Sequence, residues 1–347
     1  MTRIPRNVII FGPTWVGDLV MATANFAAIR RHFPDARITL LLKPGRHLVV
    51  DGSPDFDEVI VASSRTVADI WRLARRLRAL RFDLALLFPN SLRSALISFL
   101  AGIPQRVGYR RDMRSFLLTD VIEYEREGTK RRPVPMPFFY GKLCEQVGVT
   151  LEDSSARLHV TEACEQAARE HIERLGIAPG EKLVGLNPGA SFGSSKLWPG
   201  EHFAVTADAL HREHGSRTIL LVGPGEEAIA NEIVRHMETP VINTSSDILP
   251  LDVLKPVIRD LQLLVTTDAG PRHYAAAFGT PVVTVMGPTD PRYSAVNLER
   301  SEVVRHDVPC GPCHLKVCPI DHQCMVGITP EEVLERVKDL DLQLGVF

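Results

Sequence analysis

Short apolar runs alternate along the chain with segments in which apolar residues recur every three or four positions. In the first half, the runs cover residues 8–11, 38–42, 58–61 and 84–88, and the helical spacing covers 19–33 and 67–80. Continuous apolar runs are typical of parallel strands that are buried on both faces, and the intervening segments predict amphipathic helices. This order predicts a parallel sheet that is covered by helices on both sides.

The alternation restarts after two interruptions. Charges and prolines break it over residues 124–137, and a turn at Gly176–Gly180 breaks it again. Further strands are expected at residues 183–186, 218–222, 261–265 and 281–285, and further helices at 162–175, 201–213 and 226–237. We therefore expect an α/β chain with two Rossmann-like, doubly wound lobes, residues 1–165 and 166–347, that face each other across a cleft.

Composition narrows the class of protein. The 347 residues are 45% hydrophobic and 24% charged with a net charge of −2, so any basic recognition surface must be local and nucleic acid is not an expected partner. The longest apolar stretches, such as 95–103, reach about half of the ~20 residues that a membrane-spanning helix requires. Two isolated cysteines and a late cluster of four do not match a disulfide-stapled secreted domain. These features predict a cytoplasmic protein.

The loop after the first strand, Gly12–Asp18, stands where phosphate-binding loops open a helix. Its two glycines have the spacing of a P-loop, but Asp18-Leu19 replaces the lysine and hydroxyl residue, and a G-x-G-x-x-G fingerprint is absent. An acidic group would repel phosphate, so nucleotide binding here is disfavoured. Asp18 is either a general base that accepts a proton from a hydroxyl or the N-cap of the following helix.

Two turns in the second lobe carry groups that suit a nucleotide. Gly189 and its neighbours expose backbone N–H groups after a strand, and Lys196 adds a point charge, which together suggest a pyrophosphate cradle. Glu226 follows a Gly-Pro-Gly turn and either binds ribose hydroxyls or is an exposed first-turn glutamate.

The segment Asp268–His273 ends another apolar strand and begins a helix. The N–H groups of Ala269 and Gly270 would point at an anion there. His273 is either part of this site or a buried histidine with satisfied hydrogen bonds.

Taken together, these motifs resemble those of the lipopolysaccharide core heptosyltransferases, glycosyltransferase family 9, and above all the heptosyltransferase II type. The resemblance covers nearly the whole chain. It is carried by Gly12–Asp18, Pro89–Ser94, Ala101–Arg110, Asn187–Ala190 with Lys196, Trp198 and Pro199, and Asp268–His273.

The resemblance implies a GT-B fold in which the first lobe holds the acceptor and the second holds ADP-L-glycero-D-manno-heptose. It implies an inverting transfer to the lipopolysaccharide inner core, with Asp18 as the catalytic base and without a catalytic cofactor. The implied donor contacts are Gly189, Ser191, Lys196, Glu226, Asp268, Ala269, Gly270 and His273. The chain departs from the family pattern at Ala269, commonly Thr or Ser, and at Arg272, commonly apolar, which either supplies charge or faces solvent.

The implied acceptor is Kdo-lipid A or heptosyl-Kdo-lipid A, which would bring the enzyme into peripheral contact with the inner face of the inner membrane. Arginine forks suit its carboxylates and phosphates, and Arg93, Arg106 and Arg110 are the expected contacts. Other readings remain open: another GT-B nucleotide-sugar transferase or epimerase, a non-catalytic nucleotide-sugar-binding protein, and, more remotely, a nicotinamide dehydrogenase.

The four late cysteines, Cys310, Cys313, Cys318 and Cys324, are dense enough to suggest a structural zinc site. The four-residue gap between the middle pair is looser than in regular zinc knuckles, so a loop of partly buried thiols is the alternative. In either case we expect a structural role, because the segment is far in sequence from Asp18 and from the donor turns.

Overall fold

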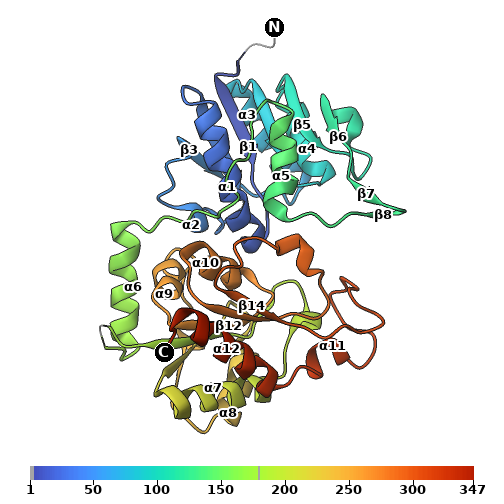
Figure 1. Cartoon of the computed structure of the whole chain (residues 1–347). Coiled ribbons are helices and arrows are strands. Elements are labelled where there is room, and N and C mark those ends of the chain that lie inside the picture. The colour runs from blue at the N-terminus through green and yellow to red at the C-terminus, as the bar shows by residue number, and fades with distance from the viewer. Residues whose placement is uncertain (1–3, 179) are drawn as a thin grey trace. The chain divides into compact units, whose positions relative to one another are not determined.

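The computed structural model describes residues 4–178 and 180–347, which form two compact units. The first unit comprises Met1–His159 and Arg292–Val296, and the second comprises Val160–Pro291 and Asn297–Phe347. Each unit is built around its own sheet (Figure 1). The boundary expected after residue 165 falls inside a helix that belongs wholly to the second unit.

The first unit contains a parallel sheet with the strand order β3-β2-β1-β4-β5-β6. Its strands are β1 (Asn7–Phe11), β2 (Arg37–Leu42), β3 (Glu58–Val61), β4 (Leu84–Leu87), β5 (Gln105–Tyr109) and β6 (Asp120–Ile122). Its helices are α1 (Val16–His32), α2 (His47–Val50), α3 (Val67–Leu80), α4 (Leu92–Leu100) and α5 (Met136–Glu145), with the short turn η1 (Ser115–Leu117). A small antiparallel hairpin joins β7 (Arg126–Glu127) to β8 (Lys130–Arg131).

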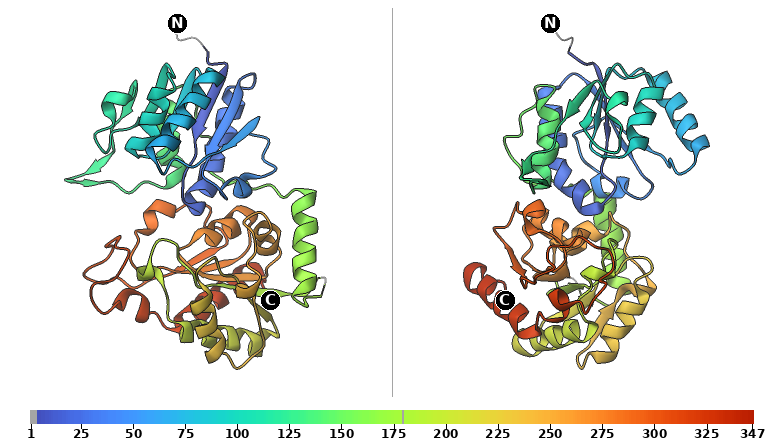
Figure 2. Two further views of the ribbon diagram at one scale, coloured as in Figure 1. Left: turned by 180° about the vertical axis from the view of Figure 1, so that it is seen from behind. Right: turned by 90° about the vertical axis from the view of Figure 1, so that its right-hand side faces the viewer.

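Helices cover both faces of this sheet, as Figure 2 shows. Helices α1 and α5 pack together on one face, and α3 packs against α4 on the other. Strand side chains such as Ile9, Ile10 and Leu86 are fully buried, because each face of the sheet meets a helix layer. This burial explains why the strands read as continuous apolar runs.

The second unit repeats the plan with the strand order β11-β10-β9-β12-β13-β14. Its strands are β9 (Leu183–Asn187), β10 (Arg217–Leu220), β11 (Val241–Asn243), β12 (Leu263–Thr267), β13 (Val282–Val285) and β14 (Ser301–Val304). Its helices are α6 (Glu162–Arg174), α7 (Gly200–His214), α8 (Glu227–His236), α9 (Leu254–Arg259), α10 (Gly270–Phe278), α11 (Gln323–Val326) and α12 (Pro330–Leu344), with short turns η2 (Ser194–Lys196), η3 (Thr244–Ser246) and η4 (Pro291–Ser294).

The α/β fold class with two doubly wound units is confirmed. In both sheets the order reverses beside the first strand, between β1 and β4 and between β9 and β12. Such a reversal opens a crevice beyond the carboxyl ends of the strands, where ligands bind in open α/β sheets. None of the helices in the described ranges is long and apolar enough to span a membrane.

One arginine of the first unit, Arg114, is fully buried, and its guanidinium is held by uncharged oxygen atoms. The Arg114 guanidinium donates to the carbonyl oxygens of Tyr109, Pro89 and Ser91, to Ser94 Oγ and to Asn90 Oδ1, at 2.6–3.2 Å. Burial lowers the pKa of Arg114 to about 10, which still leaves the side chain charged at neutral pH. Arg114 therefore ties the loop after β4 to the end of β5.

We expect Arg114→Met to lower the free energy of unfolding by at least about 2 kcal/mol, because it removes five hydrogen bonds from a buried site. Urea denaturation measures the change. The exposed Arg110 provides the control, since its ion pair with Glu123 lies in solvent and Arg110→Met should cost less than about 0.5 kcal/mol. Equal effects of the two substitutions would contradict the anchoring role of Arg114.

Candidate active site

A cavity of about 930 Å³ lies at the carboxyl ends of β1 and β4 in the first unit. The loop after β1, from Gly12 to Asp18, forms one wall, and the loop after β4, from Pro89 to Ser94, forms another. The two loops meet because β1 and β4 are hydrogen-bonded neighbours at the reversal of strand order. Asp18 and Arg93, which are far apart in sequence, therefore line the same space.

Asp18 is a half-buried residue in the first turn of α1. The helix begins at Val16 with Trp15 as its N-cap, so the interpretation of Asp18 as the N-cap is wrong. Tyr140 lines the same cavity. Burial, and to a smaller extent the negative charge of Asp18, holds the pKa of the Tyr140 phenol well above its usual value. The carboxylate thus faces an uncharged hydroxyl and an open space, where it can accept a proton from a bound molecule.

The cavity carries four cationic side chains among its lining residues, which are Lys43, Arg93, Arg111 and Arg131. Burial and the nearby arginines, Arg93 first among them, lower the pKa of Lys43. The Arg131 guanidinium lies 4.4 Å from the ring centres of both Tyr124 and Phe139, which fix it by cation–π contact. This crowding of positive charge suits an anionic ligand.

Of the three arginines expected at the acceptor, only Arg93 lines the cavity. The Arg106 guanidinium is bound to the carbonyl oxygens of Leu117 and Ile103 at 2.6 and 2.5 Å, and Arg110 pairs with Glu123. Lys43, Arg111 and Arg131 were not among the three expected contacts. Lys43 follows β2, so its position at a strand end could have identified it.

In the second unit, the turn after β9 is shaped by a contact that requires glycine. A Cβ atom on Gly189 would lie 1.9 Å from Glu226 Oε2, so only glycine leaves room for that carboxylate. Glu226 Oε2 in turn accepts the N–H of Gly223 at 2.7 Å. Thr267 Oγ1 donates to the Gly189 carbonyl at 2.7 Å and fixes the turn against β12. Gly189 and Glu226 are thus brought together, whereas Ser191 is exposed on the same loop.

Lys196 and Asp268 meet where β9 and β12 end. Lys196 Nζ donates to the Asp268 carboxylate at 2.6 Å and to its carbonyl oxygen at 2.8 Å. Arg272 Nη1 and Thr289 Oγ1 reach the same carboxylate at 3.3 and 2.7 Å. Burial alone would raise the pKa of Asp268, but the two cations hold it well below the usual range.

Arg272 is therefore a buried member of this network, with a side chain only 4% exposed, and does not face solvent. Thr289 was missed by the sequence reasoning, although it follows β13 closely. The network thus holds two cations and one carboxylate, which leaves one positive charge uncompensated.

The N-terminus of α10 lies beside this network. The helix begins at Gly270 with Ala269 as its N-cap, which makes no side-chain cap hydrogen bond. Burial, and then the Arg272 charge, lower the pKa of His273 to about 3, so its imidazole is neutral at physiological pH. His273 can donate a hydrogen bond but contributes no positive charge.

A model of glycosyltransferase family 9 (heptosyltransferase) matches residues 70–323 of this chain. The chain belongs to this family. Lipopolysaccharide heptosyltransferase 2 of Escherichia coli (strain K12) is 28% identical over 352 residues, which cover 97% of this chain and 99% of that protein. The protein is therefore a glycosyltransferase, as the sequence motifs predicted.

Solved structures agree with the GT-B fold expected from the sequence. The structure of E. coli ADP-heptose LPS heptosyltransferase II is 28% identical, has a TM-score of 0.80, and is matched over 97% of this chain and 99% of that one. A glycosyl transferase family 9 structure from Veillonella parvula DSM 2008 is 22% identical, with a TM-score of 0.83 and 97% of both chains covered.

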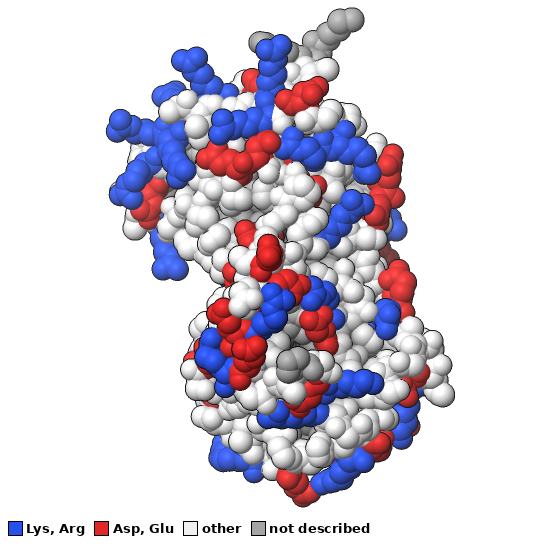
Figure 3. All heavy atoms as spheres, turned by 90° about the vertical axis from the view of Figure 1, so that its left-hand side faces the viewer, with Lys and Arg blue, Asp and Glu red and all other residues white. Residues whose placement is uncertain are grey.

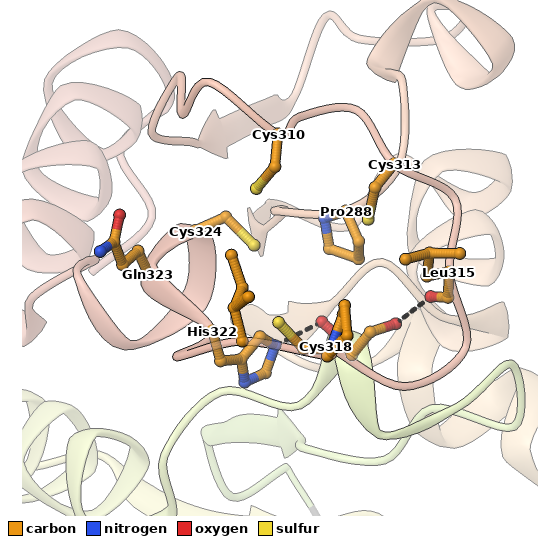
Figure 4. Close-up of a pocket in the computed structure, with 11 residues that line it drawn as sticks. Pro288, Cys310, Cys313, Leu315, Cys318, His322, Gln323 and Cys324 are labelled. Carbon is orange, nitrogen blue, oxygen red and sulfur yellow. Dashed lines mark hydrogen bonds between the residues drawn. The ribbon is translucent and has the colours of Figure 1, made fainter.

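The cysteine-rich loop of this glycosyltransferase packs against the lysine turn. All three polar groups of Ser195, next to Lys196, are bound by that loop. Its N–H donates to Lys316 O at 3.1 Å, its hydroxyl to Leu315 O at 2.5 Å, and its carbonyl oxygen lies 2.6 Å from His322 Nε2 (Figure 4). The loop is distant from the donor turn in sequence but adjacent to it in space.

The four cysteines line one small cavity beside Ser195, of about 60 Å³ (Figure 4). Burial raises the pKa of Cys324, and the other three cysteines add to the shift. Cys324 is buried whereas Cys310 is exposed, and no group of three or more metal-ligating side chains is found in residues 4–178 and 180–347. The zinc site therefore stays a hypothesis, and the contacts favour a structural role in holding the lysine turn.

We expect Cys324→Ala to lower stability by about 0.5–3 kcal/mol and also to weaken ADP binding, because the loop that holds Ser195 loses its buried thiol. Calorimetry with ADP measures the second effect. Cys144, equally buried but in the first unit, is the matched control. Cys144→Ala should lower stability and leave ADP affinity unchanged.

Elemental analysis of the same protein, purified without chelator, tests the zinc hypothesis directly. One equivalent of metal would identify the four thiols as ligands, and a content far below that would exclude a stable site. An unchanged ADP affinity in Cys324→Ala would contradict the coupling of the loop to Lys196.

Proposed function

We propose that this glycosyltransferase transfers heptose from ADP-L-glycero-D-manno-heptose to the inner core of lipopolysaccharide, as a heptosyltransferase II-like enzyme. The similar E. coli heptosyltransferases, whose names pair ADP-heptose with lipopolysaccharide, support this donor and acceptor. The observation that carries the proposal is the cavity at the strand ends, where the Asp18 carboxylate shares the lining with four cations.

The second unit is the proposed donor site. The ADP diphosphate is negatively charged, and Lys196, Arg272 and the N-terminus of α10 offer it positive charge. Glu226 lies against the Gly189 turn, where it would accept hydrogen bonds from the ribose hydroxyls. Lys196 and the N–H groups at Gly189 and Gly270 would stabilise the charge that grows on the leaving diphosphate. The remaining proposed donor contacts are Ser191, Asp268, Ala269 and His273. Ser191 is exposed beside the Gly189 turn, Asp268 orients Lys196, and Ala269 and the neutral His273 lie at the start of α10.

The first unit is the proposed acceptor site, where a heptose or Kdo hydroxyl meets Asp18. The hydroxyl oxygen attacks the anomeric carbon of the donor as Asp18 takes its proton, and the bond from that carbon to the diphosphate oxygen breaks. ADP leaves with the bonding electron pair, and the configuration at the anomeric carbon inverts. This scheme uses no catalytic cofactor.

The cations of the cavity are the proposed contacts for the acid groups of the acceptor. Kdo carboxylates and lipid A phosphates are planar or tetrahedral anions that guanidinium groups bind with paired hydrogen bonds. Arg93, Arg111 and Arg131 supply such groups. Because the acceptor is lipid-linked, the enzyme would meet it at the inner face of the inner membrane.

A different nucleotide sugar, an epimerase reaction and a purely binding role are the competing functions. Incubation with ADP-heptose or UDP-sugars and with core acceptors truncated at successive sugars separates them by the mass of the product. A mass increase of one heptose with ADP-heptose alone supports the proposal. Turnover of UDP-sugars, or donor binding without transfer, would contradict it.

We expect Asp18→Asn to lower kcat by about 10²-fold or more, the usual scale for a general base, with donor affinity unchanged. Steady-state kinetics and calorimetry with ADP give the two values. Asp112, which lines the same cavity, is the control, and Asp112→Asn should keep kcat within a few-fold of the wild type. Equal losses in both variants would mean that Asp18 contributes only general negative charge.

Alanine at Arg93, Arg111 or Arg131 should raise the KM for the acceptor and leave ADP affinity unchanged, because these groups line only the first-unit cavity. A charge-assisted contact worth roughly 1.5–3 kcal/mol corresponds to an increase of about tenfold or more. Arg106→Ala and Arg110→Ala are the comparison, with little expected change in KM. A larger increase in KM at Arg106 or Arg110 would instead support these two residues as the acceptor contacts, as expected from the sequence.

A further inference from the structure

The turn between β5 and β6 exposes two large apolar side chains. Met113 is 88% exposed and Phe116 is 76% exposed, while Arg114 between them is fully buried and Leu117 is buried behind them. The segment is therefore held firmly from inside by Arg114 and presents its apolar residues outward. Exposure of two such residues on a well-anchored turn marks an interaction surface.

The backbone of this turn is strained at two consecutive residues. Asp112 and Met113 have φ of 50° and 54°, a left-handed conformation that is unfavourable for residues other than glycine. The turn keeps this strained backbone because Arg114, which directly follows Met113, is anchored by five hydrogen bonds of its own side chain. Backbone strain of this kind concentrates at functional sites.

The surroundings of the turn are strongly basic. From residue 62 to residue 118 the chain contains eleven arginines, three aspartates and neither lysine nor glutamate, a net charge of +8 in a chain whose total is −2. Arg72, Arg75 and Arg76 are exposed on α3, which packs beside α4, and α4 contacts η1. Figure 3 shows basic side chains crowded over part of the first unit.

The turn also borders the candidate acceptor cavity. Arg111 and Asp112 line that cavity and directly precede Met113. Phe99, half exposed at the end of α4, lies 5.5 Å from the Arg106 guanidinium and extends the apolar surface. Exposed apolar side chains on a basic surface suit an anionic bilayer. The apolar side chains would enter the membrane interface, and the arginines would bind the anionic headgroups.

We propose that the turn from Arg110 to Leu117, with the basic surface of α3 and α4, is the membrane-docking surface of this enzyme, and that its partner is an anionic phospholipid bilayer. This inference rests on the proposed function, because it places a lipid-linked acceptor beside the mouth of the cavity. Met113 and Phe116 bind the bilayer and lie outside the residues that line the site.

Vesicle co-sedimentation tests the proposal with the full chain. The wild type should bind vesicles of phosphatidylcholine with phosphatidylglycerol, bind phosphatidylcholine alone weakly, and dissociate as salt screens the arginines. Met113→Ser with Phe116→Ser should weaken binding by about tenfold or more, since each substitution removes an apolar side chain that the bilayer would bury. Val205→Ser with Leu342→Ser, which removes two exposed apolar residues from the second unit, should have no effect.

Activity separates this inference from the proposed function. With a lipid-free, water-soluble acceptor the Met113/Phe116 variant should turn over as fast as the wild type, and with acceptor embedded in vesicles it should be slower. Absence of any heptose transfer by the wild type would overturn the proposed function and leave the vesicle result to stand alone. Vesicle binding that is absent in the wild type, or equal in both double variants, would overturn the docking surface, as would tight self-association that the Met113/Phe116 variant abolishes.

Discussion

Each sheet places a parallel pair, β1 with β4 and β9 with β12, where the order of the strands reverses. Because these strands are buried on both faces, their functional polar side chains lie in the loops beyond the strand ends. The loops on either side of the point where the strand order reverses diverge, which leaves a crevice at the carboxyl ends of the strands. Asp18 and Arg93 follow one pair, and Lys196 and Asp268 follow the other. Both candidate sites thus lie where the strand order of their sheet reverses.

The two units stabilise buried charge by different means. Arg114 is surrounded by carbonyl, hydroxyl and amide oxygens, which satisfy a single cation and stiffen the loop that bears Arg93. The second unit instead gathers Lys196 and Arg272 around the Asp268 carboxylate. The first arrangement leaves its single cation surrounded by uncharged oxygen atoms, whereas the second balances two cations against one carboxylate.

Local patterns allowed the elements to be predicted, because strands and helices depend on the spacing of nearby apolar residues. The helix over 67–80 and the strand over 58–61 have the predicted bounds, and the turn at Gly189 was expected where it lies. The fixed side chains could not be predicted in this way, because their partners are not set by apolar spacing. Arg106, an expected acceptor contact, instead binds the carbonyl oxygens of Leu117 and Ile103, and Ser195, to which the sequence assigned no role, is held by the distant His322.

The Lys196–Asp268 ion pair also bears on selectivity among ligands. In the proposed donor site, Asp268 neutralises one of the two cations Lys196 and Arg272, so a ligand would meet a single uncompensated positive charge. A single phosphate would then gain little at Lys196, because the attraction of that cation is already shared with Asp268. A ligand with two linked phosphates would also reach the N–H groups at the start of α10, and this arrangement favours diphosphates. Inhibitors that replace the diphosphate with a neutral linker would use neither contact, and their affinity would have to come from the base and the sugar.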